Sequence, residues 1–310
     1  MMKIDVIIPT YRPDEKLDRC LRMLRKQTVA PNRILLINTE ETLFHSKEFK
    51  KLPQGEIIHI TKPEFDHGGT RNRAASMCHG DVIVLLTQDA IPADEYLIEN
   101  LVKPFEDEEV CAAYGRQMAD WKDNPVEAYT RLFNYPKESR VKSAEDLPEL
   151  GIKTFFCSNV CAAYRKSVYD ELGGFPLHTI FNEDMIFASR LIEKGKKIAY
   201  AADAKVWHWH NYTAKEQLKR NFDLAVSQVD AGGLFLTVRS ESEGIKLVKK
   251  TLAYFIRKKK YSLVPHIILQ SAAKYIGYKL GQNYKKLPET LILKISLNPT
   301  YWNRNTGGEF

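Results

Sequence analysis

The sequence predicts an α/β protein with a mostly parallel central sheet, flanking helices and a helical region at the C-terminus. Short apolar runs of strand length alternate with helical patterns through residues 4–90, which is typical of parallel strands joined by helices. Several of these runs end in polar residues, as expected where strand ends border a ligand site. From about residue 213 onward the pattern is helical only. With 310 residues, of which 44% are apolar, the chain can bury one large core.

The composition is that of a soluble globular protein. No stretch reaches the roughly eighteen uninterrupted apolar residues of a membrane-spanning helix. Residues 1–5 lead directly into a strand without a signal-peptide pattern, so we expect a cytoplasmic protein. The cysteines lack the paired spacing of a metal site, and we expect them to be buried thiols in a reducing compartment. They are Cys20, Cys78, Cys111, Cys157 and Cys161.

The first strand is expected at 4–10, and a helix at 14–27 follows because apolar residues recur there at helical spacing. The turn between them lacks the G-x-G-x-x-G pattern that holds a dinucleotide pyrophosphate, and no P-loop pattern occurs in the chain. A nicotinamide enzyme and an ordinary NTPase are therefore disfavoured. The second and third strands are expected at 33–38 and 56–61, each followed by polar residues.

A glycine-containing turn at 65–72 overlaps the start of a helix expected at about 70–78. Its glycines allow a ligand to approach the backbone closely, and the helix N-terminus offers unpaired N–H groups to a phosphate. Arg71 in the first turn would add a positive charge. The alternative is a glycine-rich turn in which Asp66 or Thr70 caps the helix.

The fourth strand is a continuous apolar run within 81–90 that ends at Gln88 and Asp89. Such a run is typical of a buried parallel strand, and a lone acid at its carboxyl end points to a ligand. The alternative is that Asp89 caps a helix beginning near Ile91. Taken with the preceding turn, the strand-end acid favours a site for a nucleotide and a metal ion.

Seven short motifs occur in order along the chain. They are Val6 to Arg12, Phe65 to Asn72, Leu86 to Ala90, Ser158 to Tyr164, Gly173 to Pro176, Phe181 to Asp184 and His208 to Tyr212. Together they resemble family 2 glycosyltransferases, and most closely the bacterial rhamnosyltransferases, over roughly residues 3–230. The order of the motifs carries the resemblance, since none would suffice alone.

The resemblance implies a GT-A fold, which is a Rossmann-like, mostly parallel sheet with flanking helices. It also implies transfer of a sugar from a sugar nucleotide donor, with a divalent cation and with inversion at the anomeric carbon. In two places the chain departs from the family pattern. The metal motif, usually acid-x-acid, is here Gln88-Asp89-Ala90, and the acid that commonly follows the second strand appears as Thr39-Glu40. The implied nucleotide-sugar-binding residues are Pro9, Thr10, Tyr11, Arg12, Thr39, Glu40, Asp66, His67, Gly68, Arg71, Gln88 and Asp89.

The chemistry of glycosyl transfer requires the leaving diphosphate to be neutralised, and a cation held by Asp89 would do this. His208 and His210 are further candidate ligands, because residues two apart on a probable strand share a face. The cofactor is Mg²⁺ or Mn²⁺, and an imidazole ligand favours manganese. The alternative is a structural histidine pair beside aromatic residues.

The acceptor hydroxyl must lose its proton as it attacks, which calls for a general base. Two adjacent acids, Glu183 and Asp184, follow Asn182, the expected N-cap of a helix that ends at Gly195. By the family pattern Asp184 is the base, and Glu183 orients the acceptor. Acids are also common in a first helical turn for dipole reasons alone, which is the alternative. No serine or cysteine nucleophile elbow is evident, as expected for a single displacement.

Short helices and loops are expected between residues 120 and 154, on the acceptor side. Helices are then expected at 214–231, 244–260 and 262–280. We therefore divide the chain into a GT-A nucleotide-sugar-binding and catalytic domain, residues 1–212, and a basic helical region, residues 213–310.

The formal charge of +7 is concentrated in the helical region, because the segment 245–286 contains basic residues and no acid. One interpretation is an ordinary solvated face of a helical hairpin. The other is a segment lying on an anionic membrane, where each basic residue adds about 1 kcal/mol. The basic residues are Lys246, Lys249, Lys250, Arg257, Lys258, Lys259, Lys260, Lys274, Lys279, Lys285 and Lys286.

The leading hypothesis is a metal-dependent rhamnosyltransferase that uses dTDP-L-rhamnose and a glycan acceptor, which by the family is commonly lipid-linked, to build cell-surface polysaccharide at the inner face of the membrane. A second enzyme hypothesis keeps the fold and changes the donor to a UDP-hexose. A third is a non-catalytic basic protein on a membrane or nucleic acid. Nucleic acid is disfavoured because the chain has no recognised motif for it and is acidic outside the tail. The sequence leaves the oligomeric state open.

Overall fold

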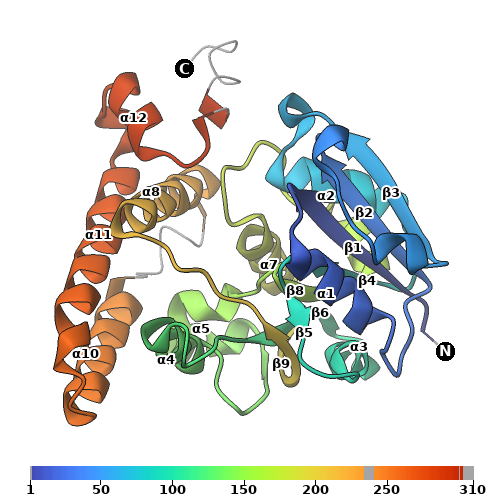
Figure 1. Ribbon diagram of the computed structural model, residues 1–310, viewed down its shortest axis with the longest axis horizontal. Coiled ribbons are helices and arrows are strands. Elements are labelled where there is room, and N and C mark those ends of the chain that lie inside the picture. Colours follow the sequence, from blue (N-terminus) through green and yellow to red (C-terminus); the bar gives the residue numbers. More distant parts are fainter. Residues whose placement is uncertain (1, 234–240, 300, 303–310) are drawn as a thin grey trace. The chain divides into compact units, whose positions relative to one another are not determined.

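The computed structural model describes residues 2–233, 241–299 and 301–302 (Figure 1). The chain forms two compact units. Unit 1 consists of Met1–Asp120, Asn134–Leu177 and Glu183–Trp209, and unit 2 of Trp121–Phe133, His178–Asn182 and His210–Phe310. The predicted boundary at residue 212 stays a prediction.

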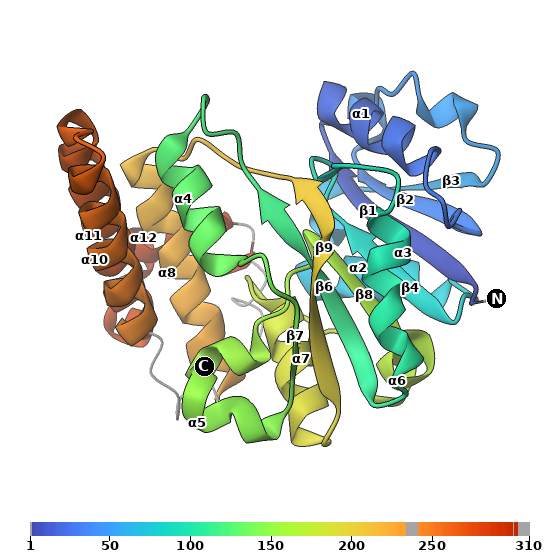
Figure 2. The same ribbon diagram turned by 90° about the horizontal axis from the view of Figure 1, so that it is seen from below.

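Unit 1 is built on a nine-stranded mixed sheet with the order β3-β2-β1-β4-β8-β6-β9-β5, and β7 pairs with β9. The first four strands of this order are parallel, whereas β8 runs antiparallel to both β4 and β6. Figure 2 shows β6 beside β8 and β9. The strands are β1 (Ile4–Tyr11), β2 (Arg33–Thr39), β3 (Gly55–Ile60), β4 (Val82–Leu86), β5 (Ile91–Pro92), β6 (Val110–Met118), β7 (Arg140–Lys142), β8 (Cys161–Arg165) and β9 (Lys197–Trp207).

The helices that cover this sheet begin and end at recognisable residues. Asp14 caps α1 by accepting a hydrogen bond from the Lys16 N–H, and Gly195, at a φ of 71°, follows α7. The α-helices of unit 1 are α1 (Glu15–Leu24), α2 (His67–Ser76), α3 (Leu97–Val102), α5 (Leu147–Leu150), α6 (Lys166–Glu171) and α7 (Glu183–Glu193). Short helices and loops therefore fill 120–154 as expected, with α4 (Pro125–Asn134) and strand β7 among them.

Every residue of β4 is buried, which agrees with the continuous apolar run expected of a central parallel strand. The main core lies between β1, β2 and β4 and the apolar side of α1, at Leu17, Leu21 and Leu24. All five cysteines are buried free thiols, so that prediction is confirmed.

Two predictions of local structure were wrong. No helix begins near Ile91, because Ile91 pairs with Trp207 in the two-residue strand β5, and α3 begins only at Leu97. Asp89 therefore does not cap a helix. Strand β9 ends at Trp207, so His208 and His210 lie beyond it and do not share a strand face.

Unit 2 is helical and has its own apolar cluster, formed by Ile180, Phe222, Val226 and Ile292. Helices α8 and α11 pack closely because α11 presents glycines: a Cβ on Gly277 would lie 2.1 Å from the Leu218 carbonyl oxygen (Figure 1). Within the described residues, no helix combines the length and the apolar composition that crossing a membrane requires. Its helices are most of α4, which lies in Trp121–Phe133, together with α8 (Ala214–Ala231), α10 (Glu241–Arg257), α11 (Val264–Gln282) and α12 (Glu289–Ile295).

Candidate active site

The carboxyl ends of β1 and β4 are joined by Gln88. Its Oε1 atom accepts a hydrogen bond from the Tyr11 N–H at 2.9 Å, and its Nε2 atom donates to the Tyr11 carbonyl at 3.1 Å. A carboxylate could accept the first bond but could not donate the second. This pairing gives a physical reason for an amide where the family commonly places an acid.

The ends of β1, β2 and β3 are joined by a buried asparagine that the sequence did not single out. The Thr10 hydroxyl donates to Asn38 Oδ1 at 3.0 Å, and Asn38 Nδ2 donates to the Glu40 carbonyl at 3.1 Å and also lies 3.1 Å from His59 Nδ1. Glu40 has a positive φ of 66°, and its Oε1 accepts from the Lys62 N–H at 2.6 Å. Its carboxylate is thereby held at the edge formed by the strand ends.

Asp89 lies beside His208 at the end of β4. The distance between Asp89 Oδ1 and His208 Nε2 is 3.6 Å, and their side chains are 17% and 6% exposed. These two residues are the part of a candidate Asp/His cation site that lies in unit 1. His210 is the first residue of the last segment of unit 2.

The tautomer of His208 follows from its neighbours. Gln117 Nε2 donates to the Ser158 hydroxyl at 3.0 Å, and the Gln117 Oε1 atom faces His208 Nδ1, also at 3.0 Å. Oε1 is only an acceptor, and therefore Nδ1 carries the proton. The lone pair of Nε2 is then directed toward Asp89, as required of a metal-binding imidazole.

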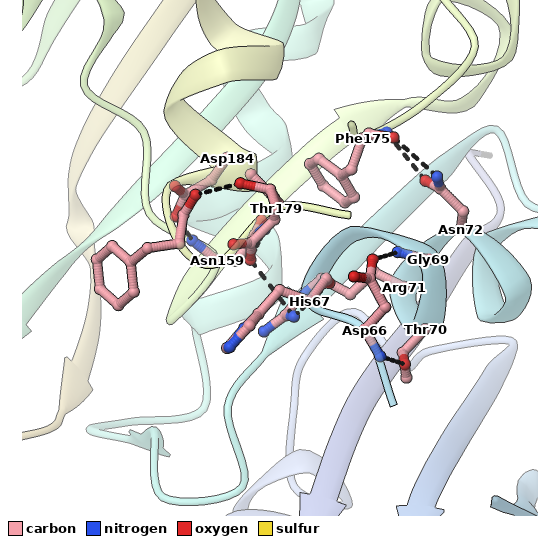
Figure 3. Close-up of polar contacts among 12 residues, drawn as sticks. Asp66, His67, Gly69, Thr70, Arg71, Asn72, Asn159, Phe175, Thr179 and Asp184 are labelled. Atoms are coloured by element: carbon pink, nitrogen blue, oxygen red, sulfur yellow. Dashed lines mark hydrogen bonds and ion pairs between the residues drawn. The ribbon is translucent and has the colours of Figure 1, made fainter. Parts of the chain in front are cut away.

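The 65–72 turn is organised by its own side chains (Figure 3). Asp66 caps α2, because its Oδ1 accepts from the Gly69 N–H at 2.7 Å, and the Thr70 hydroxyl accepts from the Asp66 N–H at 3.0 Å. The helix consequently begins at His67, earlier than the predicted Thr70. A Cβ on Gly68 would lie 1.8 Å from the Pro176 carbonyl oxygen, so this glycine is needed for packing.

Asn72 links this turn to the Gly173 to Pro176 motif. Its Nδ2 donates to the Phe175 carbonyl, and its Oδ1 accepts from the Phe175 N–H, both at 2.9 Å (Figure 3). The Tyr169 hydroxyl donates to the same Oδ1 atom. Two motifs that are distant in the sequence therefore form one structural feature.

The two acids at the start of α7 are both held by Asn159. The Asn159 N–H donates to Asp184 Oδ2 at 2.9 Å, and its Nδ2 donates to Glu183 Oε1 at 3.0 Å. Its Oδ1 accepts from the Tyr164 hydroxyl at 2.8 Å, which fixes the orientation of the amide. Asn159 lies in the Ser158 to Tyr164 motif, but no local pattern indicated that it would hold both acids. Asn182, the expected N-cap, instead donates to Ser227 within unit 2.

The two acids have opposite pKa shifts. Burial acts to raise the pKa of Glu183, but the positive charge of Arg71, together with His67 and Asn159, leaves it below its ordinary value. Burial, and then repulsion by the Glu183 carboxylate, raise the pKa of Asp184 to about 7. Asp184 is therefore suited to take up a proton near neutral pH, which is the property required of a general base.

Comparison with known proteins agrees with this geometry. A family model described as "Glycosyl transferase family 2" matches residues 5–173. The chain is 40% identical to the "O-antigen chain rhamnosyltransferase RfbN" of Salmonella typhimurium, with 97% of this chain and 96% of that protein covered. It is 38% identical to the "O-antigen chain rhamnosyltransferase WbaN" of Salmonella anatum, with 98% and 96% covered.

Two solved structures resemble the fold. The mannosyltransferase PcManGT from Pyrobaculum calidifontis, in complex with GDP-Man and Mn²⁺, has a TM-score of 0.62 at 13% identity, with 92% of this chain and 88% of that chain covered. S. aureus TarS 1-349, in complex with UDP-GlcNAc, has a TM-score of 0.52 at 13% identity, with 92% of each chain covered. At this identity they show the fold alone, and the predicted GT-A fold with a helical C-terminal region is confirmed.

Proposed function

Because the chain belongs to glycosyl transferase family 2, as its motifs predicted, we propose that it is an inverting rhamnosyltransferase. It moves L-rhamnose from dTDP-L-rhamnose to a hydroxyl of a cell-surface glycan acceptor. The donor sugar is supported by 40% identity to an O-antigen rhamnosyltransferase over almost the whole chain. The acceptor is a lipid-linked glycan of O-antigen type.

The observation that carries this proposal is the half-buried Asp184 with its raised pKa beside the buried Glu183, whose pKa is lowered. As the acceptor oxygen attacks the anomeric carbon, Asp184 takes its proton. The bond from the anomeric carbon to the dTDP oxygen breaks, and the electron pair leaves with the diphosphate. One displacement inverts the anomeric centre and requires no covalent intermediate. Glu183 is the second catalytic carboxylate, and its predicted contact with the acceptor stays a prediction.

Asp89, His208 and His210 are proposed to hold the divalent cation. The His208 tautomer fits this role, because Nδ1 donates to Gln117 and Nε2 faces Asp89. His210 follows two residues later, so the chain alone keeps its Cα within about 7 Å of that of His208. When bound, the cation neutralises charge on the leaving diphosphate, and imidazole ligands favour Mn²⁺ over Mg²⁺.

The donor is proposed to bind at the carboxyl ends of β1, β2 and β4 and at the start of α2, all within unit 1. Crevices at such strand ends are the general ligand sites of α/β sheets. The proposed contacts are Pro9, Thr10, Tyr11, Arg12, Thr39, Glu40, Asp66, His67, Gly68, Arg71, Gln88 and Asp89.

Unit 2 is proposed to rest peripherally on the anionic inner face of the cell membrane. Nine of the eleven basic residues in 245–286 are exposed. On α11, the side opposite the glycines carries an exposed apolar stripe at helical spacing. The stripe is Ile268, Leu269, Tyr275 and Ile276. An apolar stripe flanked by cations is typical of a helix lying in a lipid interface, and it would bring the enzyme to a lipid-linked acceptor.

The test is turnover of dTDP-L-rhamnose compared with UDP-glucose and GDP-mannose, each with Mn²⁺ and a lipid-linked glycan acceptor. We expect rhamnose transfer with dTDP-L-rhamnose and loss of that transfer when EDTA is added. Preferred use of a UDP- or GDP-sugar would refute the proposed donor, and full activity in EDTA would refute the cation.

A further inference from the structure

A buried ion pair connects α2 to the acids of α7. Arg71 Nη1 lies 3.4 Å from Glu183 Oε1, and the two side chains are 9% and 8% exposed. The same nitrogen donates to the His67 carbonyl, one turn back on α2, at 2.7 Å. The guanidinium is therefore held by its own helix and directed at Glu183.

Glu183 depends on this partner for its charge. A buried carboxylate without a counter-ion takes up a proton instead of remaining ionised. Asn159 Nδ2 contributes a hydrogen bond to Glu183, and Arg71 contributes a full positive charge within 4 Å. Glu183 in turn is the immediate chain neighbour of Asp184, and both contact Asn159.

We infer that Arg71 is a positioning residue for the base: it holds Glu183 in place as an anion, and this pair sets the electrostatic surroundings in which Asp184 accepts the acceptor proton. The inference rests on the proposed role of Asp184 as base. It gives Arg71 a role inside the protein that differs from direct contact with the donor phosphates, the role expected from its place in the 65–72 turn.

The other ionisable groups around the acids do not replace this pair. Among the described residues they are His67 on α2, Cys157 before β8, Tyr164 within β8 and Tyr169 on α6. Burial raises the pKa of Cys157 to about 12 and the pKa values of Tyr164 and Tyr169 well above their ordinary value, so all three are neutral at physiological pH. His67 is retained in every variant below.

The test compares two single substitutions with the double variant Arg71→Met/Glu183→Gln. In Glu183→Gln the negative neighbour of Asp184 is lost while Asn159 keeps an acceptor, so Asp184 should ionise more easily. In Arg71→Met the positive charge is lost and Glu183 takes up a proton, so neither residue of the pair carries a charge, as in the double variant. We expect the acidic limb of the kcat–pH profile to move to lower pH in Glu183→Gln by about 1 unit or more, and to lie at the same pH in Arg71→Met as in the double variant.

The double variant and Arg71→Lys complete the design. The double variant Arg71→Met/Glu183→Gln removes both charges and should return the limb toward that of the wild type. Arg71→Lys keeps the charge and should leave the limb near its original place. Each variant is checked by thermal unfolding, and if Arg71→Met does not fold, Glu183→Gln and Arg71→Lys decide the question. A purely structural role would lower the plateau of the profile without moving the limb.

A limb that does not move in Glu183→Gln, or one that lies at higher pH in Arg71→Met than in the double variant, would overturn the inference. Asp184→Asn separates this failure from that of the proposed function. If Asp184→Asn is inactive while the limbs stay in place, only the role of Arg71 is wrong. If Asp184→Asn remains active, the assignment of the base is wrong, and the inference fails with it.

Discussion

Gln117 offers the sharpest test of the cation site, because only the tertiary structure brings it to His208. In Gln117→Leu the acceptor of the His208 Nδ1 proton is lost, while a side chain of similar volume remains on β6. Gln117 is only 2% exposed, so water has little access to replace the lost partner. The proton can then move to Nε2, where it blocks the lone pair that faces Asp89.

The expected loss of Mn²⁺ affinity follows from the role of residues that hydrogen-bond to a metal-binding histidine. Losing the hydrogen-bond partner of a metal-binding histidine typically costs about 10- to 100-fold in metal affinity, which is about 1.4 to 2.7 kcal/mol. The measurement is a Mn²⁺ titration of the protein with dTDP present, followed by the electron paramagnetic resonance signal of free Mn²⁺. We expect Gln117→Leu to bind Mn²⁺ at least about 10-fold more weakly than the wild type.

Two matched variants test the explanation. Gln117→Glu keeps an oxygen acceptor for Nδ1 and should retain Mn²⁺ affinity. Ser158→Ala removes one hydrogen-bond partner of the Gln117 amide and should weaken binding less than Gln117→Leu does. If a folded Gln117→Leu binds Mn²⁺ as tightly as the wild type, then His208 is not a ligand held through Gln117, and the tautomer argument fails.

The remaining predictions concern the other parts of the proposed machinery. Asp89→Ala should abolish divalent-ion-dependent dTDP binding in calorimetry without changing the circular dichroism spectrum; unchanged Mn²⁺ dependence would contradict the assignment. Asp184→Asn should lower kcat by about 10² or more with little change in donor affinity. Since the pKa of Asp184 is raised to about 7 and the ionised form is the base, wild-type kcat should fall as pH drops below 7. Substitution of Lys258, Lys259 and Lys260 by Glu should release the protein from anionic vesicles at low salt, where charges are least screened. The same triple substitution should leave sugar transfer to a short water-soluble acceptor unchanged. Equal vesicle binding by the triple variant and the wild type would show an ordinary solvated face.

The sequence by itself determined the parallel half of the sheet and the family. Continuous apolar runs such as Val82–Leu86 are typical of a strand buried on both faces of a sheet, and β4 is parallel to β1. The order of the seven motifs was sufficient to indicate the family that the comparison then confirmed. Asp89, Glu183 and Asp184 were found because an acid directly after a strand or at a helix start is a local signal.

Only the tertiary structure decided what these residues contact. Ile91 and Pro92 became a strand because Trp207 and Val206 pair with them, and no local pattern near Ile91 indicates a partner so distant in the chain. The burial of Arg71 against Glu183 is equally invisible in the sequence, where an arginine beside glycines at a helix start is typical of a phosphate site.

The physical reason for this difference is the distance along the chain over which each kind of interaction acts. Strand and helix patterns depend on neighbours a few residues apart, so they can be read directly from the chain. Hydrogen bonds such as Gln117 to His208 and Asn72 to Phe175 join residues 91 and 103 positions apart, and they form only once the sheet order has been set. The acids could therefore be located from the sequence, whereas their charges and the tautomer of His208 were decided by the fold.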